Sequence, residues 1–230
     1  MHILTPQEQQ LIDAISNNDL KTIKELATNN VNLNVQDDQA VGWAALMHAL
    51  RLSKKDVAKF LIEAGANPDT PSRASGSTAL MISVNAGDIS AVKMLLNAKA
   101  NPNIQNDSGA TALTWWTIAE NESHTEIIQA LLDAGADPNI TNNDGETALI
   151  STIKKGHYTD VIQALIKAGV DINMPDNDGK TALDIAIERG YTEIITLLNA
   201  KNITASTNAV ITKLQQYRPR HVPRLRRRRR

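Results

Sequence analysis

The sequence predicts an all-α solenoid, in which short helix-turn-helix units stack side by side and are joined by β-hairpin-like turns. Two short phrases recur at a near-constant period and in matching phase along most of the chain. Aromatic residues make up only 3% of the 230 residues, whereas 42% are hydrophobic. A core of Leu, Ile, Val and Ala suits closely packed short helices, and a fixed period is the signature of repeat architectures.

The first phrase has the form Gly-x-Thr-Ala-Leu. It stands at residues 76–80, 109–113, 145–149 and 179–183, with a degenerate copy at 42–46. The five leucines lie 34, 33, 36 and 34 residues apart. The second phrase, Ala-Gly-Ala-Asn/Asp-Pro-Asn or a close variant, falls between the copies at 64–69, 98–103, 134–139 and 168–173. Each period therefore contains one supersecondary unit.

Within one period, the pattern predicts two short helices and a turn. From Thr147, a residue suited to a helix start, apolar residues stand at positions 149, 150 and 153. A second apolar stripe occupies positions 161, 162, 165 and 166, and Gly169 then supplies a left-handed helix end. The segment 171–179 is rich in Asp and Asn, which hydrogen-bond turn backbone. Helices of roughly 8–10 residues are unstable alone in water, so each unit must stack on its neighbours.

Together the phrases resemble the ankyrin repeat, whose usual motifs are Asp-x-x-Gly-x-Thr-Pro-Leu-His and Leu-Leu-x-x-Gly-Ala-Asp-x-Asn. The resemblance covers about residues 5–200, as a weaker N-terminal unit and five full repeats. The full repeats begin near Gln39, Arg73, Asn106, Asn142 and Asp176. Ala replaces the motif Pro in all five, and the motif His becomes Met47, Met81, Thr114, Ile150 or Asp184. We therefore expect the hydrogen bonds usually credited to that His to be missing, and the scaffold to be less stable than one with the usual motif.

The organisation that we predict has four segments. Residues 1–38 form an N-terminal capping repeat, whose more polar outer face meets water, and residues 39–200 form the five repeats. Residues 201–217 carry apolar positions at 210, 211, 214 and 217, a helical stripe that would cover the open end of the stack. Residues 218–230 contain two prolines and eight arginines, so we expect this tail to be disordered.

The composition excludes several classes of protein. There is no Cys, so disulfides and thiolate metal sites are excluded. The N-terminus has no signal-peptide pattern, and no segment approaches 18 uninterrupted apolar residues. We expect a monomeric cytoplasmic protein without a membrane span. The net charge of −1 hides an asymmetry, because residues 1–200 carry 14 Lys and Arg against 25 Asp and Glu, whereas residues 201–230 carry ten and none.

The resemblance implies a protein-protein interaction scaffold that binds its partner through a concave face. This face is lined by hairpin tips and the exposed ends of the first helices. Carried over by motif position, the predicted partner-binding residues are Val41, Trp43, Arg51, Leu52, Ser75, Asn85, Asp107, Trp116, Ile118, Asp144, Glu146, Lys154, Lys155, Lys180 and Arg189. One half of this surface is apolar and the other half is charged.

The three tryptophans give the sharpest local signal, because Trp is enriched at binding hot spots. Trp43 stands at a hairpin tip, where we expect it to be exposed. Trp115 takes the place of a core Leu and is expected to pack between helices. Trp116 replaces a small Ala and either widens the packing or protrudes into the groove. Trp43, Leu52, Trp116 and Ile118 form the predicted apolar patch.

The sequence carries no recognisable motif of catalysis, metal binding or phosphate binding. No two of the five histidines stand at His-x-x-x-His spacing, and there is no Gly-x-Gly-x-x-Gly or P-loop phrase. His124 and His157 fall after inter-helix turns, where a turn hydrogen bond is the simpler role. The Asp- and Asn-rich phrases at 142–145 and 176–179 lack the bidentate Glu of a calcium loop. The sequence thus predicts no enzyme activity and no cofactor.

The basic tail supports an alternative function, anion or nucleic-acid binding. Its electrostatic residues are Arg224, Arg226, Arg227, Arg228, Arg229 and Arg230. The block could bind phosphate on nucleic acid or an anionic membrane, fold back on the acidic body, act as an address signal, or be an incidental extension. It lacks interleaved aromatics for base stacking, and the acidic body would repel phosphate. We expect the tail to play an accessory role.

Overall fold

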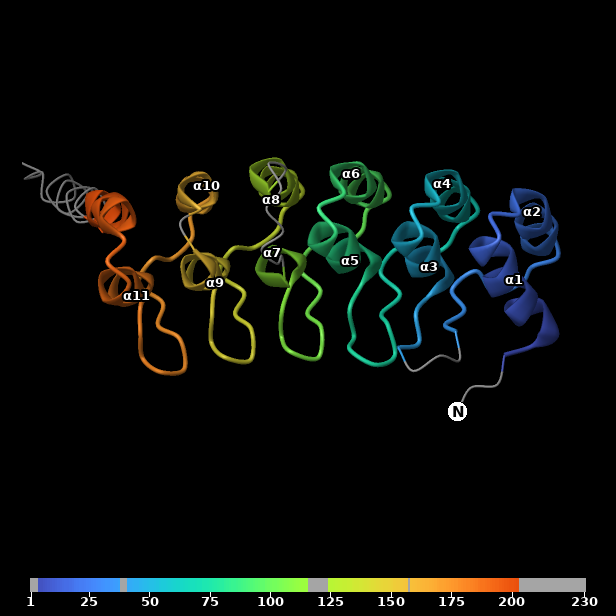
Figure 1. Ribbon diagram of the computed structural model, residues 1–230, viewed down its shortest axis with the longest axis horizontal. Coiled ribbons are helices and arrows are strands. Elements are labelled where there is room, and N and C mark those ends of the chain that lie inside the picture. The colour runs from blue at the N-terminus through green and yellow to red at the C-terminus, as the bar shows by residue number, and fades with distance from the viewer. Residues whose placement is uncertain (1–3, 38–40, 116–123, 157, 203–230) are drawn as a thin grey trace, which may run out of the picture.

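The computed structural model describes residues 4–37, 41–115, 124–156 and 158–202. Helices follow one another in pairs, and the pairs stack in a row (Figure 1). The first helices of the pairs are α1 (Pro6–Ser16), α3 (Ala45–Arg51), α5 (Ala79–Asn85), α7 (Ala112–Trp115), α9 (Ala148–Lys155) and α11 (Ala182–Glu188). The second helices are α2 (Leu20–Thr28), α4 (Lys55–Glu63), α6 (Ile89–Asn97), α8 (His124–Asp133) and α10 (Thr159–Lys167), and residues 192–202 are helical beside α11.

The two sets of helices form two layers, and the loops between pairs project from the layer of first helices as hairpins (Figure 1). Among the described residues, the only strand-like pairing is an isolated antiparallel bridge between Gln36 and Ala44. The predicted all-α solenoid, with hairpin-like turns between helix pairs, is therefore confirmed.

Threonine side chains start the first helices, as predicted for Thr147. The hydroxyls of Thr78, Thr147 and Thr181 each accept a hydrogen bond from the backbone N–H of the third helical residue. This bond satisfies one of the donors that a helix N-terminus leaves unpaired. Ala44 stands at the same position before α3 and provides no side-chain cap.

A left-handed residue ends the second helix of each pair. Gly65, Gly135 and Gly169 have φ angles of 94°, 88° and 89°, which confirms the helix end predicted at Gly169. Lys99 occupies the same position after α6, with a φ of 65°. A side chain at positive φ is strained, so the third repeat ends this helix at a cost that the other three avoid.

The core is aliphatic, and it runs continuously along the stack. In the fifth repeat, Leu149, Ile150, Ile153, Val161 and Leu165 are all buried, as their periodic spacing predicts. Alanines at the starts of the first helices are also buried, which lets the short helices approach closely. No helix is stable alone, so the shared core holds the units together.

Each hairpin is fixed by one polar side chain at its first position. The Oδ1 atoms of Asn106, Asn142 and Asp176 each accept backbone N–H groups from the residues two and four positions later, at 2.9–3.1 Å. Asn106 and Asp176 are buried. Asx side chains thus satisfy the hairpin backbone, as the turn-rich composition predicts.

Hydrogen bonds join neighbouring repeats even though the motif His is replaced in every copy. Along the hairpins, the N–H groups of Asp107, Asn143 and Asn177 donate to carbonyls of the preceding hairpin at 2.9–3.0 Å. A second series runs after the second helices, where an Asx oxygen of one repeat accepts the N–H of an Asx residue in the next. Its pairs are Asn34 with Asn67, Asp69 with Asn101, Asn103 with Asp137, and Asn139 with Asp171, at 2.6–2.9 Å.

Parts of the predicted organisation lie outside the described residues. They include all but the first two residues of the predicted capping helix, the whole tail 218–230, and Trp116, Ile118 and His157. The segment boundaries at 38, 200 and 217, and the roles given to these segments, stay predictions. No described helix has the length and apolar character needed to cross a bilayer.

Candidate functional site

A cavity of about 500 Å³ lies where the second, third and fourth repeats meet on the hairpin side of the first helices. It is lined by Val41, Trp43, Leu50, Arg51, Ser53, Ser75, Ser77, Ile82, Ser83, Asn85, Ala86, Asp88, Ala91 and Trp115. Smaller cavities of about 270 and 330 Å³ lie along the second helices, beside α8 and α10 and beside α10 and the last helical stretch. The cavity at the first helices is larger than these two and, unlike them, is lined by two tryptophans.

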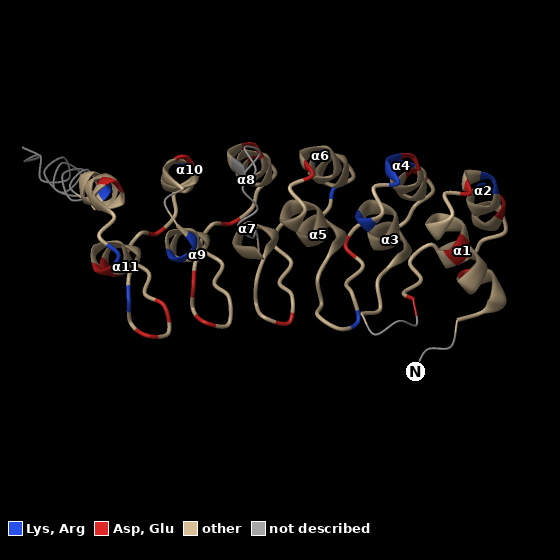
Figure 2. Ribbon diagram, in the orientation of Figure 1, with Lys and Arg blue, Asp and Glu red and all other residues tan. Residues whose placement is uncertain are grey.

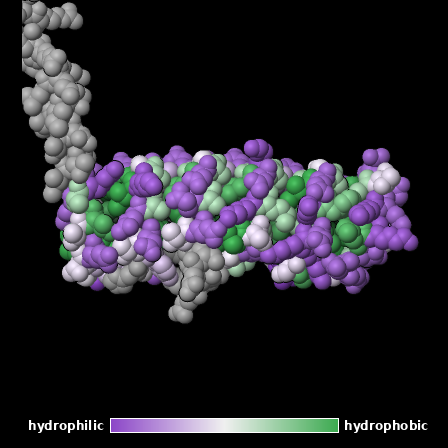
Figure 3. All heavy atoms as spheres, turned by 90° about the horizontal axis from the view of Figure 1, so that it is seen from above, coloured by the Kyte–Doolittle hydropathy of each residue, from purple (hydrophilic) through white to green (hydrophobic). Residues whose placement is uncertain are grey.

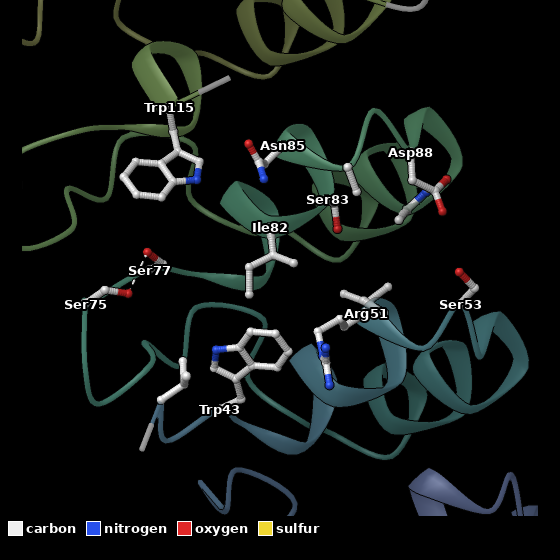
Figure 4. Close-up of a pocket in the computed structure, with 14 residues that line it drawn as sticks. Trp43, Arg51, Ser53, Ser75, Ser77, Ile82, Ser83, Asn85, Asp88 and Trp115 are labelled. Atoms are coloured by element: carbon white, nitrogen blue, oxygen red, sulfur yellow. Dashed lines mark hydrogen bonds between the residues drawn. The ribbon is translucent and has the colours of Figure 1, made fainter. Parts of the chain in front are cut away.

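Three large apolar side chains form the wall of this cavity. Trp43 comes from the hairpin leg before α3, Ile82 from α5 and Trp115 from the end of α7. In Figure 4, the two indole rings lie on opposite sides of Ile82. All three side chains are half-buried and pack against the core, which fixes them while leaving a face towards the cavity.

The ring of Trp43 is held by contacts on more than one side. The Arg51 guanidinium lies 4.4 Å from the ring centroid, in cation–π geometry. His48 contacts the ring edge-on, with centroids 5.7 Å apart, and its Nε2 hydrogen-bonds Asp37. The buried Asp37 also accepts the backbone N–H of Trp43 at 3.1 Å. The indole is therefore preorganised before any partner arrives.

Hydroxyl groups line the hairpin side of the cavity. The Oγ of Ser75 lies 2.9 Å from the Oγ atoms of both Ser72 and Ser77, so three hydroxyls form a chain. The Ser77 backbone N–H donates to the Ser72 Oγ, which places Ser72 in the role that Asn and Asp play in the later hairpins. These hydroxyls offer adaptable donors and acceptors beside the apolar wall.

The acidic group of the cavity, Asp88, already has partners. Its carboxylate caps α6 by accepting the backbone N–H groups of Ser90 and Ala91 at 3.1 Å, and Lys55 lies 3.2 Å away. Burial opposes ionisation, but hydrogen bonds from the Ser90 hydroxyl, Ala91 and Lys55 hold the pKa of the Asp88 carboxyl below its usual value. Asp88 is therefore an ionised carboxylate that Lys55 neutralises.

Five of the predicted partner-binding residues line this cavity, namely Val41, Trp43, Arg51, Ser75 and Asn85. The structure corrects one other expectation. Trp43 is half-buried rather than exposed, because Arg51 and His48 pack against its ring. Leu52 caps the end of α3 and does not line this cavity, and its predicted contact with a partner stays a prediction. Trp115 packs against the core as predicted, but it also lines the cavity.

In the fifth and sixth repeats, most predicted contact residues already bind other groups of this chain. Lys154 Nζ lies 2.8 Å from both Glu146 and the buried Asp176, and Lys180 lies 2.8 Å from Glu188. Arg189 donates to the Lys154 carbonyl at 2.6 Å, and Lys155 donates to the Thr114 carbonyl at 3.2 Å. These charges stabilise the stack, which limits their availability to a partner.

The remaining predicted contacts, Asp107 and Asp144, are exposed at hairpin tips. The hairpins before α7, α9 and α11 carry acidic residues, whereas the hairpin before α5 carries a basic one, Arg73 (Figure 2). The opposite side of the stack, seen from above in Figure 3, is mostly hydrophilic, with apolar groups among the polar ones. The sign of the hairpin charge thus changes between the third repeat and the fourth.

Ile82 and Asp88 line the cavity but are not among the residues predicted from the sequence. Ile82 stands two positions after the repeat Leu, which is also the position of Trp115 in the next repeat. Comparison of equivalent positions could have paired the two side chains, because equivalent residues of neighbouring repeats lie side by side. Asp88 shows only as a helix cap in the sequence.

The described residues contain no group of three or more His, Cys, Asp or Glu residues that could hold a metal ion. His48, the histidine closest to the cavity wall, is hydrogen-bonded to Asp37. His124 is the first residue of α8, and His157 lies outside the described residues. The arrangement offers shape, aromatic surface and charge, which are the attributes of a binding surface.

The fold and this surface define a helical repeat protein of the kind used for macromolecular recognition. The family model described as three copies of the ankyrin repeat matches two segments of the chain, residues 11–106 and 115–209. The chain therefore belongs to the ankyrin-repeat family, which confirms the resemblance seen in its motifs. Ankyrin repeats are in general protein-protein interaction modules.

Solved structures agree over most of the chain. An ankyrin repeat domain from Acinetobacter baumannii AYE has a TM-score of 0.75 and 32% identity, covering 85% of this chain and 98% of that one. Another ankyrin repeat protein has a TM-score of 0.70 and 27% identity, covering 82% and 96%. These similarities extend along the stack and support the all-α solenoid.

Curated relatives match over shorter stretches. A putative ankyrin repeat-containing protein of Treponema pallidum is 33% identical over 78 residues, which are 34% of this chain and 25% of that protein. The human 2-5A-dependent ribonuclease is 29% identical over 79 residues, which are 34% of this chain but only 10% of the enzyme. The matched segments thus span a quarter or less of these relatives.

Proposed function

We propose that this protein is a non-catalytic binding module that holds a partner protein at the cavity formed by Trp43, Ile82 and Trp115. The observation that carries the proposal is the pair of preorganised indoles on opposite sides of one aliphatic side chain (Figure 4). Tryptophan in a well-packed pocket is enriched among the hot spots of protein interfaces, because it brings a large apolar surface at a small entropic cost.

The charged half of the concave face supports the same location. Glu146, Lys154, Lys180 and Glu188 satisfy one another, so a partner would have to replace existing ion pairs to bind them. At the cavity, a partner would cover apolar surface and could hydrogen-bond the serine hydroxyls. Binding there is more favourable than binding that must first break ion pairs. Val41, at the rim, is one of two large hydrophobic residues described as exposed, at 41%.

Site-specific photocrosslinking would test this proposal. Val41 is replaced by p-benzoylphenylalanine, and the full chain is irradiated in lysate of its source organism. Ile187 is the matched control, since it is a large hydrophobic residue that is 56% exposed on α11, away from the cavity lining. We expect a discrete protein adduct from position 41 that Ile82→Asp abolishes. Adducts of equal yield from position 187 would place the binding surface elsewhere.

The alternative, anion or nucleic-acid binding through Arg224, Arg226 and the final four arginines, rests on the sequence alone, because these residues lie outside the described part of the chain. The same crosslinking with a chain that ends at Tyr217 separates the two functions. We expect the adduct at position 41 to survive this truncation. Loss of the adduct, together with its loss after nuclease or added salt, would favour the alternative.

A further inference from the structure

Two positions that face each other in the second, fifth and sixth repeats carry different chemistry at the two ends of the stack. The first lies in the hairpin leg and is held by Trp43, Ser77, Glu146 and Lys180 in the second, third, fifth and sixth repeats. The second lies eight residues later, at the first helix, and is held by Arg51, Asn85, Lys154 and Glu188. Corresponding pairs can therefore be compared directly.

In the fifth and sixth repeats, this pair of positions forms an ion pair. Glu146 lies 2.8 Å from Lys154, and Lys180 lies 2.8 Å from Glu188. In the second repeat, Trp43 stands where Glu146 stands in the fifth. Arg51 therefore packs on an indole, and no described carboxylate lies within ion-pair distance of its guanidinium. Arg51 is also exposed, so the guanidinium remains accessible to a ligand.

The second and third repeats, which supply most of the cavity lining, carry a net positive charge in a chain whose body is acidic. Residues 39–105 carry seven Lys and Arg against four Asp and Glu, whereas residues 106–200 carry five against 15. The one carboxylate in the lining, Asp88, is neutralised by Lys55. Arg73 lies beside the cavity hairpin, where its backbone N–H donates to the Gly42 carbonyl at 3.0 Å. The local field therefore favours an anionic group.

We infer that the cavity recognises a partner segment in which a carboxylate side chain stands next to a large apolar side chain. The apolar side chain enters between Trp43, Ile82 and Trp115, and the carboxylate meets Arg51, in the role that Glu146 plays towards Lys154. A guanidinium held over an indole is partly preorganised to bind a carboxylate, which it can do in a bidentate manner. The serine hydroxyls face the backbone of the segment. This inference rests on the proposed function, because it specifies the ligand of the same cavity.

A selection from random displayed heptapeptides tests the inference even while the natural partner is unidentified. Full-length wild type is the target, and a synthetic peptide of residues 218–230 is the counter-target that removes peptides bound by the arginine-rich tail. The retained peptides are then assayed against full-length Arg51→Glu and Ile82→Asp. Val41→Asp, at the exposed rim, is a second variant in case Ile82→Asp fails to fold, and circular dichroism checks each fold. Lys93→Glu, at an ion pair with Glu126 on the second helices, changes the net charge equally and serves as the control.

We expect the retained peptides to carry Asp or Glu beside Leu, Ile, Phe, Met or Trp. Synthetic copies should bind Arg51→Gln at least about tenfold more weakly than wild type, as expected for loss of a charged hydrogen bond, and should bind Lys93→Glu unchanged. Copies in which Arg replaces the acidic residue should regain binding to Arg51→Glu. This charge exchange would show direct contact between the two side chains.

The other outcomes overturn different claims. Peptides that are apolar or basic, and that lose binding to Ile82→Asp but not to Arg51→Glu, would refute the acidic ligand and leave the cavity as the binding site. Peptides that bind Ile82→Asp and Val41→Asp as well as wild type would refute the cavity itself, and with it the proposed function. Failure to enrich any peptide would refute recognition of a short acidic segment, and the crosslinking at position 41 would then decide the proposed function.

Discussion

The ammonium group of Lys154, at the end of α9, lies 2.8 Å from the Oδ2 of Asp176, the first residue of the next hairpin. The Asp176 side chain is only 1% exposed, and Lys154 also lies 2.8 Å from Glu146 in its own repeat. One cation therefore joins two repeats through two carboxylates. This link acts between repeats. The family motif usually relies there on a histidine, which other residues replace in every full repeat of this chain.

Replacing Lys154 by Met should therefore destabilise the stack. The substitution keeps the aliphatic stem but leaves the buried Asp176 carboxylate without its cation, at a cost of about 1–3 kcal/mol in the free energy of unfolding. Urea unfolding measures the difference. Lys180→Met is the matched control, because its ion pair with Glu188 is exposed and we expect a change below about 1 kcal/mol. Equal effects of the two substitutions would contradict a special role for Lys154.

The pH dependence of this difference follows from the carboxylates. Burial opposes their ionisation, but the hydrogen bond from Lys154 helps to hold the pKa values of Glu146 and Asp176 below their usual values of 4.5 and 3.8. Groups with a lowered pKa stabilise the fold above their unfolded-state pKa and lose this contribution as the pH falls through the folded-state value. The difference between wild type and Lys154→Met should therefore shrink below about pH 4.

The pKa of Lys155, the next residue, should make the stability of the fold depend on pH in the alkaline range as well. Burial lowers the pKa of its ammonium group from 10.5 to about 8. Between these values, the unfolded chain binds more protons than the folded one, so stability rises with pH. Wild type should gain on the order of 2 kcal/mol relative to Lys155→Met between pH 7 and pH 10. Parallel stability curves for the two proteins would show that the folded chain does not lower this pKa.

The sequence was sufficient to predict the architecture, because each repeat carries its own helix start, apolar stripes and turn. Thr147 caps its helix and Gly169 ends one, and both follow from local chemistry. Side-chain partners were harder to predict. Trp43 meets Arg51, and Glu146 meets Lys154, only because the hairpin leg folds back along the first helix.

The burial of the Trp43 side chain could not be predicted from the sequence. Its place beside the motif Gly indicated an exposed tip, and no apolar periodicity connects it with Ile82 or Trp115. Its half-buried position arises from contacts with Arg51 and His48 across the repeat and from the neighbouring repeat. Aligning equivalent positions of the repeats recovers some of these contacts. Whether the Trp43 ring packs on Arg51 or faces solvent, however, depends on the three-dimensional geometry.

Lys99 offers a stabilising substitution at the end of α6. Its φ of 65° is easy for Gly and strained for Lys, and Gly occupies the same position at residues 65, 135 and 169. Lys99→Gly should raise the free energy of unfolding by about 1 kcal/mol, the relief of strain being partly offset by a more flexible unfolded chain. Thermal unfolding measures the change. The reciprocal Gly65→Lys should destabilise by a similar amount, since space around Gly65 is open and only the backbone strain remains.

Substitutions of Asn106 test whether the polar side chain at the first hairpin position stabilises the hairpin. Its Oδ1 accepts the backbone N–H groups of Ser108 and Ala110 at 3.1 and 2.9 Å, and the side chain is buried. Asn106→Ala removes this acceptor from both donors and should destabilise the protein by about 1–3 kcal/mol.

Asn106→Asp separates the acceptor from the shape of the side chain. The Asp carboxylate keeps an oxygen in the same place, as Asp176 does when it accepts the N–H groups of Asp178 and Lys180 in the last hairpin. We expect Asn106→Asp to unfold within about 1 kcal/mol of wild type, because backbone donors favour a carboxylate whereas burial without a cation opposes it. If Asn106→Asp were as destabilising as Asn106→Ala in urea, the hydrogen-bonded oxygen would not be what fixes the hairpin, and packing of the amide group would have to account for the loss.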